Sequence, residues 1–348
     1  MNITVAVIGG GYFASFHLKA WLRLASVTVI ALVEKDPEKL RTHALEHPNL
    51  LCTDSIDKLH ELPSIDIIDI ATPPDTHAQL ISEALQLDCS IIVCQKPFCQ
   101  TMESAFEVEK AVSQSGKKLV IHENFRFQPW YRAIKSQLQS NVLGDILQAS
   151  FRLRPGDGQG TDAYLARQPY FRQMEKFLIR ETGIHFIDLF RYLFGEPDAI
   201  SAELRQLNPE LSGEDAGYFI FHYQHGMLAH FDGNRLLDHA THNTRLTMGE
   251  MLIEGTHASL SLHGNGNLLV RKFGEAHWLP VNYKFDDRDF GGDCVYHLQK
   301  HIIRHVVHKT PLENEAHDYL QNLALEELVY QAASSHTRLD TVNTRMNV

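Results

Sequence analysis

The stretch that decides the fold lies near the start of the chain and reads ITVAVIGGGYFA, residues 3–14. Its first six residues are mostly β-branched and apolar, which predicts a buried strand over 3–8. The spacing G-x-G-x-x-A follows, at Gly9, Gly11 and Ala14. The first glycine permits a tight turn, the second lets a pyrophosphate approach the backbone, and the small third residue lets helix and strand pack closely. The stretch therefore predicts a dinucleotide-binding strand–turn–helix unit, with a glycine turn that binds nothing as the alternative.

The same alternation of strand and helix continues through the first third of the chain. Further buried strands are predicted at 27–33, 65–71, 91–93 and 119–121, and helices at 13–25, 37–47, 76–87 and 101–115. Strict alternation of this kind is typical of a doubly wound parallel sheet. We therefore predict an α/β fold whose first domain, residues 1–123, is a Rossmann domain that binds a dinucleotide.

The pattern changes after residue 123. Helices are predicted at 129–140, 183–194, 294–308 and 314–334, and a strand at 146–153. A glycine-rich loop is predicted at 155–160, and alternating strands and turns over 200–283. The strands and turns predict a large, mainly antiparallel open sheet. We assign residues 124–348 to an α+β domain for substrate binding and oligomerisation, and we expect the ligand to bind between the two domains.

Composition excludes several classes of protein. The chain has 348 residues, 44% of them hydrophobic, and a net charge of −11 that argues against nucleic acid or an anionic membrane as the main partner. No apolar run approaches the roughly 18 residues of a membrane span, and no basic leader precedes the first strand. The five cysteines form no C-x-x-C pair, which favours reduced thiols. We predict a cytoplasmic protein.

The end of the predicted second strand carries a carboxylate, Glu34. In a dinucleotide-binding unit, a carboxylate at this place accepts hydrogen bonds from a ribose 2′-hydroxyl and repels a 2′-phosphate. NAD is therefore favoured over NADP, although the neighbouring Lys35 slightly weakens this preference.

More polar residues lie where later parallel strands end, which is the edge at which open α/β sheets bind ligands. Two segments there are ATPPDTH (71–77) and CQKPF (94–98). Lys96 lies at the top of its strand and can reach a bound ligand, although a solvated surface lysine is the commoner case. Asn124 and Arg126 follow the last parallel strand, and Arg126 is equally a candidate for a structural ion pair.

A further motif, ETGIHFID at 181–188, lies at the start of the helix predicted at 183–194. With the glycine turn, the T-P-P-x-x-H segment and the K-P pair, it makes nearly the whole chain resemble the Gfo/Idh/MocA family of NAD(P)-dependent sugar oxidoreductases. Family members usually carry Glu at the position of Gln95 and Asp at that of Glu181. The strings QKPF (95–98) and HENFR (122–126) are most similar to the D-apiose dehydrogenase branch.

The resemblance implies that Lys96 and His185 lie together at the substrate. Oxidising a sugar hydroxyl needs a base for its proton, and a histidine suits that task near neutral pH. His185 is the candidate base, with Asp188 at i+3 to orient its ring. Lys96 would stabilise charge on the reacting oxygen, and Glu181 would bind a sugar hydroxyl or the lysine. A histidine among apolar neighbours is otherwise more often a satisfied core residue.

The remaining contacts are assigned by position in the motifs and loops. Cofactor contacts are assigned to Gly9, Gly11, Tyr12, Phe13, Ala14, Glu34, Thr72, Pro73, His77, Gln95, Lys96 and Asn124. Substrate contacts are assigned to Arg126 and, by polarity and loop position, to Asp157, Tyr164 and Asn234.

Two other patterns remain open to more than one interpretation. His297, His301 and His305 follow one face of the helix predicted at 294–308, a geometry that suits a metal, but no carboxylate or Cys accompanies them at zinc-motif spacing. We expect a half-exposed helix there and no metal. The alternation of Phe219, Phe221 and Tyr223 faces either the core or a partner subunit.

The sequence therefore predicts a dehydrogenase that transfers hydride from a sugar or cyclic polyol hydroxyl to NAD, with an aldose C1 hydroxyl and a lactone product as one form of the reaction. The resemblance implies a homodimer or homotetramer that associates through the sheet of the second domain. Two alternatives stay open, namely an epimerase or glycoside-cleaving enzyme that oxidises its substrate only transiently, and a non-catalytic regulator that senses the cofactor.

Overall fold

The computed structural model describes residues 2–342, which form two compact units. One unit comprises the chain up to Asn124 together with Cys294–Leu320, and the other comprises Phe125–Asp293 and the chain from Gln321 onward. The grouping differs from the domain prediction because 294–320 belongs to the first unit. The predicted domain ends at residues 1 and 348 lie outside the described residues.

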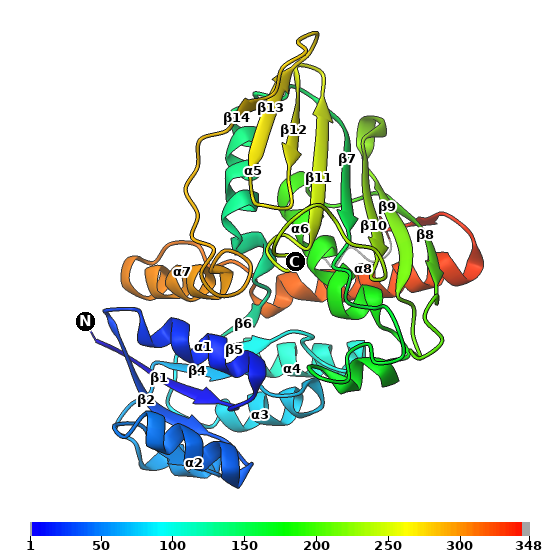
Figure 1. Cartoon of the computed structure of the whole chain (residues 1–348). Helices are drawn as coiled ribbons and strands as arrows, with labels where there is room; N and C mark the ends of the chain where they lie inside the picture. The colour runs from blue at the N-terminus through cyan, green and yellow to red at the C-terminus, as the bar shows by residue number, and fades with distance from the viewer. Residues whose placement is uncertain (1, 343–348) are drawn as a thin grey trace. The chain divides into compact units, whose positions relative to one another are not determined.

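The first unit contains a six-stranded sheet in the order β3-β2-β1-β4-β5-β6 (Figure 1). All its pairings are parallel. Its strands are β1 Ile3–Ile8, β2 Val27–Val33, β3 Leu51–Thr53, β4 Ile67–Ile70, β5 Ile91–Gln95 and β6 Lys118–His122. The order reverses beside β1, which is the switch point where doubly wound sheets bind ligands. The predicted parallel sheet is confirmed, and only the short β3 was missed.

Helices connect these strands. They are α1 Tyr12–Leu22, α2 Pro37–Glu46, α3 His77–Ala84 and α4 Met102–Ser115, with 3-10 turns at Ile56–Glu61 and Pro74–Thr76. α2 begins at a proline whose missing N–H costs nothing in the first turn, and Asp36 caps it by accepting from two backbone N–H groups. α4 ends at Gly116, which has the left-handed φ of 73° that glycine tolerates best.

One helix from late in the chain completes the first unit. α7, Cys294–His308, contacts α1. The Gln299 side chain donates to the His17 backbone carbonyl at 3.1 Å, and Arg23 lies over the Tyr296 ring at 4.4 Å. These contacts explain why residues far apart in sequence belong to one unit.

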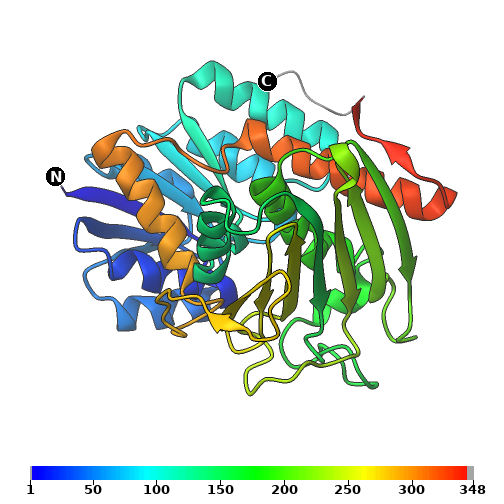
Figure 2. The ribbon, with the colours of Figure 1, turned by 90° about the horizontal axis from the view of Figure 1, so that it is seen from above.

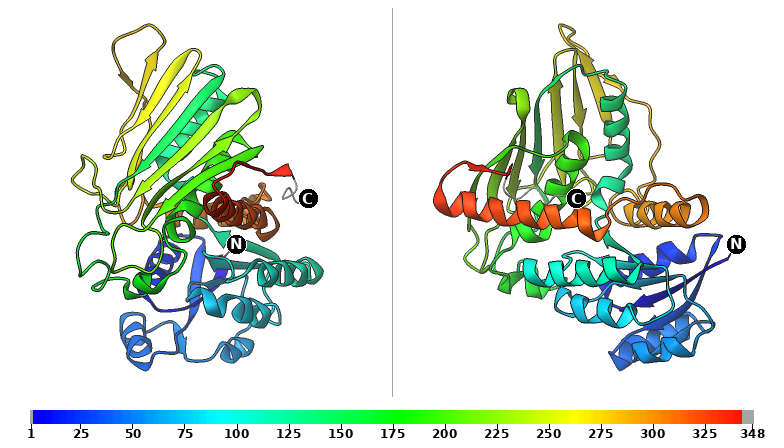
Figure 3. Two further views of the ribbon diagram at one scale, coloured as in Figure 1. Left: turned by 90° about the vertical axis from the view of Figure 1, so that its right-hand side faces the viewer. Right: turned by 180° about the vertical axis from the view of Figure 1, so that it is seen from behind.

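The second unit contains a nine-stranded sheet in the order β14-β13-β12-β11-β7-β10-β9-β8-β15 (Figures 2 and 3). Its strands are β7 Ile146–Leu153, β8 Ala199–Arg205, β9 Ala216–His222, β10 Leu228–Asn234, β11 Gly249–Gly255, β12 Ala258–Leu262, β13 Leu268–Lys272, β14 Leu279–Pro280 and β15 Leu339–Asp340. Only the central β7–β10 pairing is parallel. The predicted, mainly antiparallel sheet is therefore confirmed.

One face of this sheet packs against helices. The helices of the unit are α5 Pro129–Gln139, α6 Ile184–Phe194 and most of α8, Ala316–Ser335, with short turns at Phe125–Phe127, Pro169–Gln173 and Gln224–Gly226 and a π-helical turn at Leu178–Gly183. Phe186 of α6 stacks on Phe151 at 4.0 Å and approaches Phe231 at 5.1 Å. Phe219 and Phe221 are fully buried, so they face the core and not a partner.

Within the described residues, no helix combines the length and the apolar character needed to cross a bilayer.

Candidate active site

Two glycines of the first turn, Gly9 and Gly11, have different surroundings. Gly9 has φ of 112°, and a Cβ there would lie 2.5 Å from the Ala71 carbonyl oxygen, so folding itself demands glycine. Gly11 caps α1 with φ of −79°, and a Cβ there meets no atom of the described chain within 4 Å. The helix N-terminus beyond it exposes backbone N–H groups to anions. The predicted pyrophosphate contact at Gly11 stays a prediction, and the described chain leaves this space open for it. Ala14 is buried, as close packing of α1 requires.

Glu34 lies beside this turn, as predicted. One carboxylate oxygen accepts from the Gly10 N–H at 2.7 Å, and the other accepts from the Asp36 N–H at 2.8 Å. Each oxygen keeps a second lone pair. The side chain is thus held by two backbone groups and can still accept hydrogen bonds from ribose hydroxyls.

His77 ties together the two polar segments that follow β4 and β5. It is fully buried, and its ring nitrogens lie 2.9 Å from the carbonyl oxygens of Thr72 and Pro97. Burial lowers the pKa of His77, although the backbone hydrogen bonds act in the other direction. The structure therefore shows His77 holding loops, while its predicted contact with the cofactor stays a prediction.

A buried chain of polar groups leads to the backbone of Lys96. The Asp69 carboxylate accepts from the His17 Nδ1–H at 2.9 Å, which leaves a lone pair on His17 Nε2. The amide nitrogen of Gln95 donates to that lone pair at 3.3 Å, and its oxygen accepts from the Lys96 N–H at 2.7 Å. Each link fixes the orientation of the next, so Gln95 positions the backbone of the predicted catalytic lysine.

Sequence reasoning missed two members of this chain, His17 and Asp69. Asp69 lies within the apolar strand β4 and is fully buried, and Trp21 also donates to it, at 2.6 Å. A lone carboxylate inside a buried strand requires a partner, because an unpaired buried charge is very costly. That argument could have identified Asp69, but not the partner 52 residues earlier.

Two further polar residues lie at the end of β6. The His122 ring lies against His17 with ring centroids 3.9 Å apart and the two planes tilted by 33°. Burial, and then His17, lower the pKa of His122 well below its ordinary value. Asn124 is 2% exposed, and its Oδ1 has no hydrogen-bond partner among the described residues. A buried acceptor of this kind suits a ligand that donates to it, as predicted for the cofactor.

In the second unit, Glu181 and His185 lie on either side of a change in helix type. Glu181 belongs to the π-helical turn Leu178–Gly183, and His185 lies in the first turn of α6. Such π turns are rare and are often found at functional sites. The His185 ring is 6% exposed and stacks parallel on Phe125 with centroids 3.8 Å apart, which fixes the plane of the ring.

Arg126 forms a structural ion pair, one of the two interpretations left open above. It donates to both carboxylate oxygens of Asp188, at 2.8 and 2.5 Å, and Asn322 donates to the same carboxylate at 2.8 Å. Asp188 is therefore firmly held within the second unit. Its predicted role in orienting His185 and the predicted substrate contact of Arg126 stay predictions.

Asp157 and Tyr164 meet around a residue that the sequence did not single out, Arg235. Arg235 donates to Asp157 at 2.9 Å, to the Tyr164 hydroxyl at 2.7 Å and to the Thr182 hydroxyl at 2.8 Å. Burial lowers the pKa of Arg235, but Asp157 and Tyr164 outweigh it and raise the pKa. The network thus links the glycine-rich loop to the π-helical turn that carries Glu181.

The other predicted positions have local partners. Asn234 ends β10, and its side-chain oxygen accepts from the Leu236 N–H at 3.0 Å. Of the histidines on α7, His301 accepts from the Glu313 N–H at 3.0 Å, and His305 Nδ1 lies 2.7 Å from the Thr310 carbonyl oxygen. These two rings hold the segment that follows α7.

Comparison with known proteins decides the family. A model described as an oxidoreductase family with an NAD-binding Rossmann fold matches residues 3–123, and a model of the GFO/IDH/MocA C-terminal domain matches residues 131–261. The chain belongs to the Gfo/Idh/MocA family. It is an oxidoreductase whose first domain binds NAD.

Two curated relatives are similar along nearly the whole chain. A D-apiose dehydrogenase from Paraburkholderia graminis is 28% identical over 338 residues, covering 94% of this chain and 87% of the relative. One from Rhizobium rhizogenes is 26% identical over 352 residues, covering 98% and 99%. A solved oxidoreductase from Agrobacterium radiobacter, in complex with NAD+, L-tartaric acid and magnesium, is 24% identical, with a TM-score of 0.87 over 99% of this chain and 100% of that chain. The last similarity confirms the fold.

The glycine turn of this family member yields a test that separates folding from cofactor binding. We expect Gly11→Ala to unfold near the wild-type temperature but to bind NAD at least about tenfold more weakly, because only the ligand competes for that space. Gly9→Ala should lose at least about 1–3 kcal/mol of stability from backbone strain alone. Thermal unfolding and NAD titration calorimetry measure both effects. Wild-type NAD affinity in Gly11→Ala would contradict the assignment.

The link between Gln95 and His17 predicts a pH-dependent defect in Gln95→Glu. The new carboxylate would face the lone pair of His17 Nε2, and the two groups repel each other unless a proton binds between them. The folded variant therefore binds this proton more tightly than the unfolded chain does, and it loses stability as the pH rises. Its deficit in unfolding free energy should therefore be small at pH 5.5 and grow by about 1–2 kcal/mol up to pH 8.5. Urea unfolding at both pH values measures this, with exposed Gln86→Glu as the control. A deficit independent of pH would contradict the tautomer assigned to His17.

Proposed function

We propose that the chain oxidises a sugar or cyclic polyol hydroxyl with NAD as the hydride acceptor. The observation that carries the proposal is the open space at Gly11, which the fold leaves unfilled beside Glu34 and the α1 N-terminus. Two relatives named D-apiose dehydrogenase support a sugar substrate, since they match over 94% and 98% of this chain. NAD supplies the acceptor for the hydride that leaves the substrate carbon.

We assign the proton transfer to His185 and the stabilisation of the reacting oxygen to Lys96. As the C–H bond breaks, the hydroxyl loses its proton to the His185 ring, and the ammonium of Lys96 stabilises the negative charge that grows on the oxygen. Stacking on Phe125 holds the His185 ring in one plane, and Gln95 holds the Lys96 backbone. Both groups are therefore preorganised within their own units. Glu181 would accept a hydrogen bond from another sugar hydroxyl.

We propose D-apiose or a similar aldose as the substrate and its C1 hydroxyl as the group oxidised. Loss of a hydride from C1 and of the proton from its hydroxyl would convert the cyclic sugar into a lactone, with bound NAD as the hydride acceptor. The Arg235 network places Asp157 and Tyr164 beside the turn that carries Glu181. We expect these two residues to shape the sugar site mainly through that turn.

Substitution of the two assigned residues tests the mechanism. His185→Asn should lower kcat by about 10²–10⁴ because the base is lost, and Lys96→Met should lower it by about 10²–10³ because the oxyanion loses its cation. The matched control is Lys118→Met, since Lys118 is half-exposed and pairs with Glu315 at 2.6 Å. The rate of NADH formation with D-apiose and a panel of pentoses, hexoses and cyclic polyols is the measurement.

The same assay separates the proposed reaction from its rivals. Equal amounts of lactone and NADH support a dehydrogenase. Product without net NADH would indicate transient oxidation, as in an epimerase. Binding of NAD with no turnover of any sugar, together with unchanged biological activity of the Lys96→Ala, His185→Ala double variant, would indicate a regulator.

We propose that the protein is a homo-oligomer that associates through the sheet face opposite the helices. Leu252, Ser150, His230 and Ile220 are register neighbours across four strands and lie half-buried on that face. This row contains two apolar residues, Leu252 and Ile220, and two polar ones, Ser150 and His230. Protein interfaces commonly contain such a mixture of apolar and polar side chains. These residues lie on β11, β7, β10 and β9, which are successive neighbours in the sheet (Figure 1).

Sedimentation tests this association. The wild-type protein should sediment as a dimer or tetramer, and Ile220→Lys should shift it toward the monomer, because a charge would be buried without a partner. Phe106→Lys on α4, at a residue 43% exposed, is the control and should leave the assembly unchanged. A monomeric wild-type protein would overturn the proposal.

We propose the cytoplasm as the place of action. The five cysteines are thiols, and four of them are buried. Such thiols persist in a reducing compartment.

A further inference from the structure

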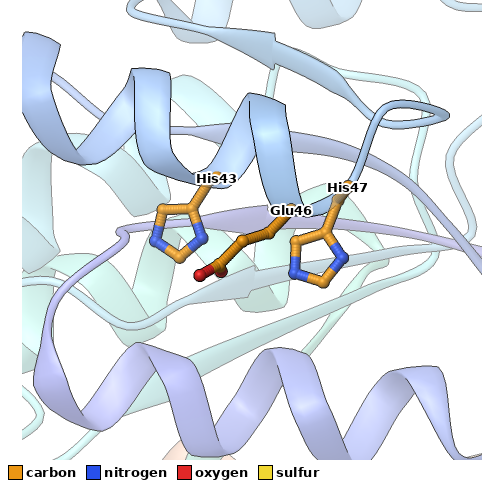
Figure 4. Close-up of side chains that lie close together, drawn as sticks. All are labelled: His43, Glu46 and His47. Carbon is orange, nitrogen blue, oxygen red and sulfur yellow. The ribbon is translucent and has the colours of Figure 1, made fainter.

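The last turn of α2 brings together three potential metal ligands that take no part in the proposed reaction. They are His43, Glu46 and His47, from the sequence HALEH, and one ligand atom of each lies within 4.8 Å of those of the others. Figure 4 shows the Glu46 carboxylate between the two imidazole rings. Residues at i and i+4 lie on one face of a helix, so the helix itself places the two rings one turn apart.

His43 already has the tautomer that metal binding requires. Its Nε2 lies 3.2 Å from the Gly10 carbonyl oxygen, which can only accept, so Nε2 carries the proton and Nδ1 keeps a lone pair. Nδ1 is buried and has no hydrogen-bond partner in the part of the chain that the structure describes. A histidine that donates one ring N–H to a backbone carbonyl and offers the other nitrogen is the usual arrangement around bound metals.

His47 and the helix end favour a cation at the same place. The two rings are nearly parallel, with an interplanar angle of 16° and centroids 6.4 Å apart. His47 caps the C-terminus of α2, where the helix dipole attracts positive charge. Both rings are half-buried while Glu46 is exposed, so the carboxylate can turn toward an ion without disturbing the core.

We propose that His43 Nδ1, His47 and Glu46 bind one divalent cation of the zinc class, with water completing the coordination. Two imidazoles and a carboxylate form a ligand set that zinc accepts readily, and nickel and copper bind imidazole as well. Bonds of about 2.0–2.1 Å place tetrahedral ligand atoms roughly 3.3 Å apart, so Glu46 and His47 must rotate toward His43 Nδ1, while His43 keeps its bond to Gly10. The ion fastens α2 to the glycine turn, because coordination at Nδ1 strengthens the bond from His43 Nε2–H to Gly10.

Zinc titration of the full chain tests the proposal. Chelator-treated protein is titrated with ZnCl2 against a chromophoric competitor. We expect one tight site per chain, at least a tenfold loss of affinity in His43→Ala and in His47→Ala, and a smaller loss in Glu46→Gln. His60→Ala, which removes an exposed histidine outside the cluster, should bind zinc like the wild type.

His43→Gln separates metal binding from folding. Its side-chain amide can still donate to the Gly10 carbonyl, but it offers no nitrogen lone pair for a metal. With chelator present, this variant should unfold at the wild-type temperature, and zinc should raise that temperature only in the wild type. If the wild type, the His43 and the His47 variants bind the same number of zinc ions with the same affinity, the ions are held by other histidines and the proposal is overturned.

Discussion

A fully buried carboxylate, Asp69, sets the arrangement of the first unit. It lies in β4 at the centre of the parallel sheet, where an unpaired charge would be very costly, and two residues of α1 satisfy it, His17 and Trp21. Leaving a buried polar group without its hydrogen-bond partner costs about 1–3 kcal/mol, and more when that group is charged. The pairing therefore orients α1, and with it the glycine turn that begins the helix. Through the fixed tautomer of His17, the same carboxylate also orients Gln95 and the backbone of Lys96.

The second unit also contains a buried charged group that needs partners, but here the group is a cation, Arg235. The Arg235 side chain is 2% exposed, and its donors bind the carboxylate of Asp157 and the phenol of Tyr164 in one loop and the hydroxyl of Thr182 in the π-helical turn. Its guanidinium also lies 4.7 Å from the centre of the Phe177 ring, so its apolar faces are covered as well. A planar cation with five donors can join segments that no regular hydrogen-bond ladder connects. It thereby supports the π-helical turn at the start of the family motif.

Prediction from the sequence succeeded where the information is local. Strand and helix periodicity identified five of the six strands of the parallel sheet, and the G-x-G-x-x-A spacing identified the turn beside Glu34. It failed where two distant residues decide the outcome. Nothing in the local pattern links Asp69 to His17. Nor does it show that Asp157 and Tyr164 form hydrogen bonds with Arg235 and with each other. The π-helical turn Leu178–Gly183 was likewise missed, since the predicted helix begins only at residue 183.

The three consecutive glycines show how unequal identical residues can be. Position 9 requires glycine because the backbone carbonyl of Ala71, just after β4, leaves no room for a side chain. Both backbone polar groups of Gly10 have side-chain partners. Glu34 accepts a hydrogen bond from its N–H, and His43 donates one to its carbonyl. At Gly11 neither constraint applies within the described chain. Because the polar groups of Gly10 are already satisfied, the backbone donors offered to an anion begin at Gly11, which is where the turn is empty of protein atoms.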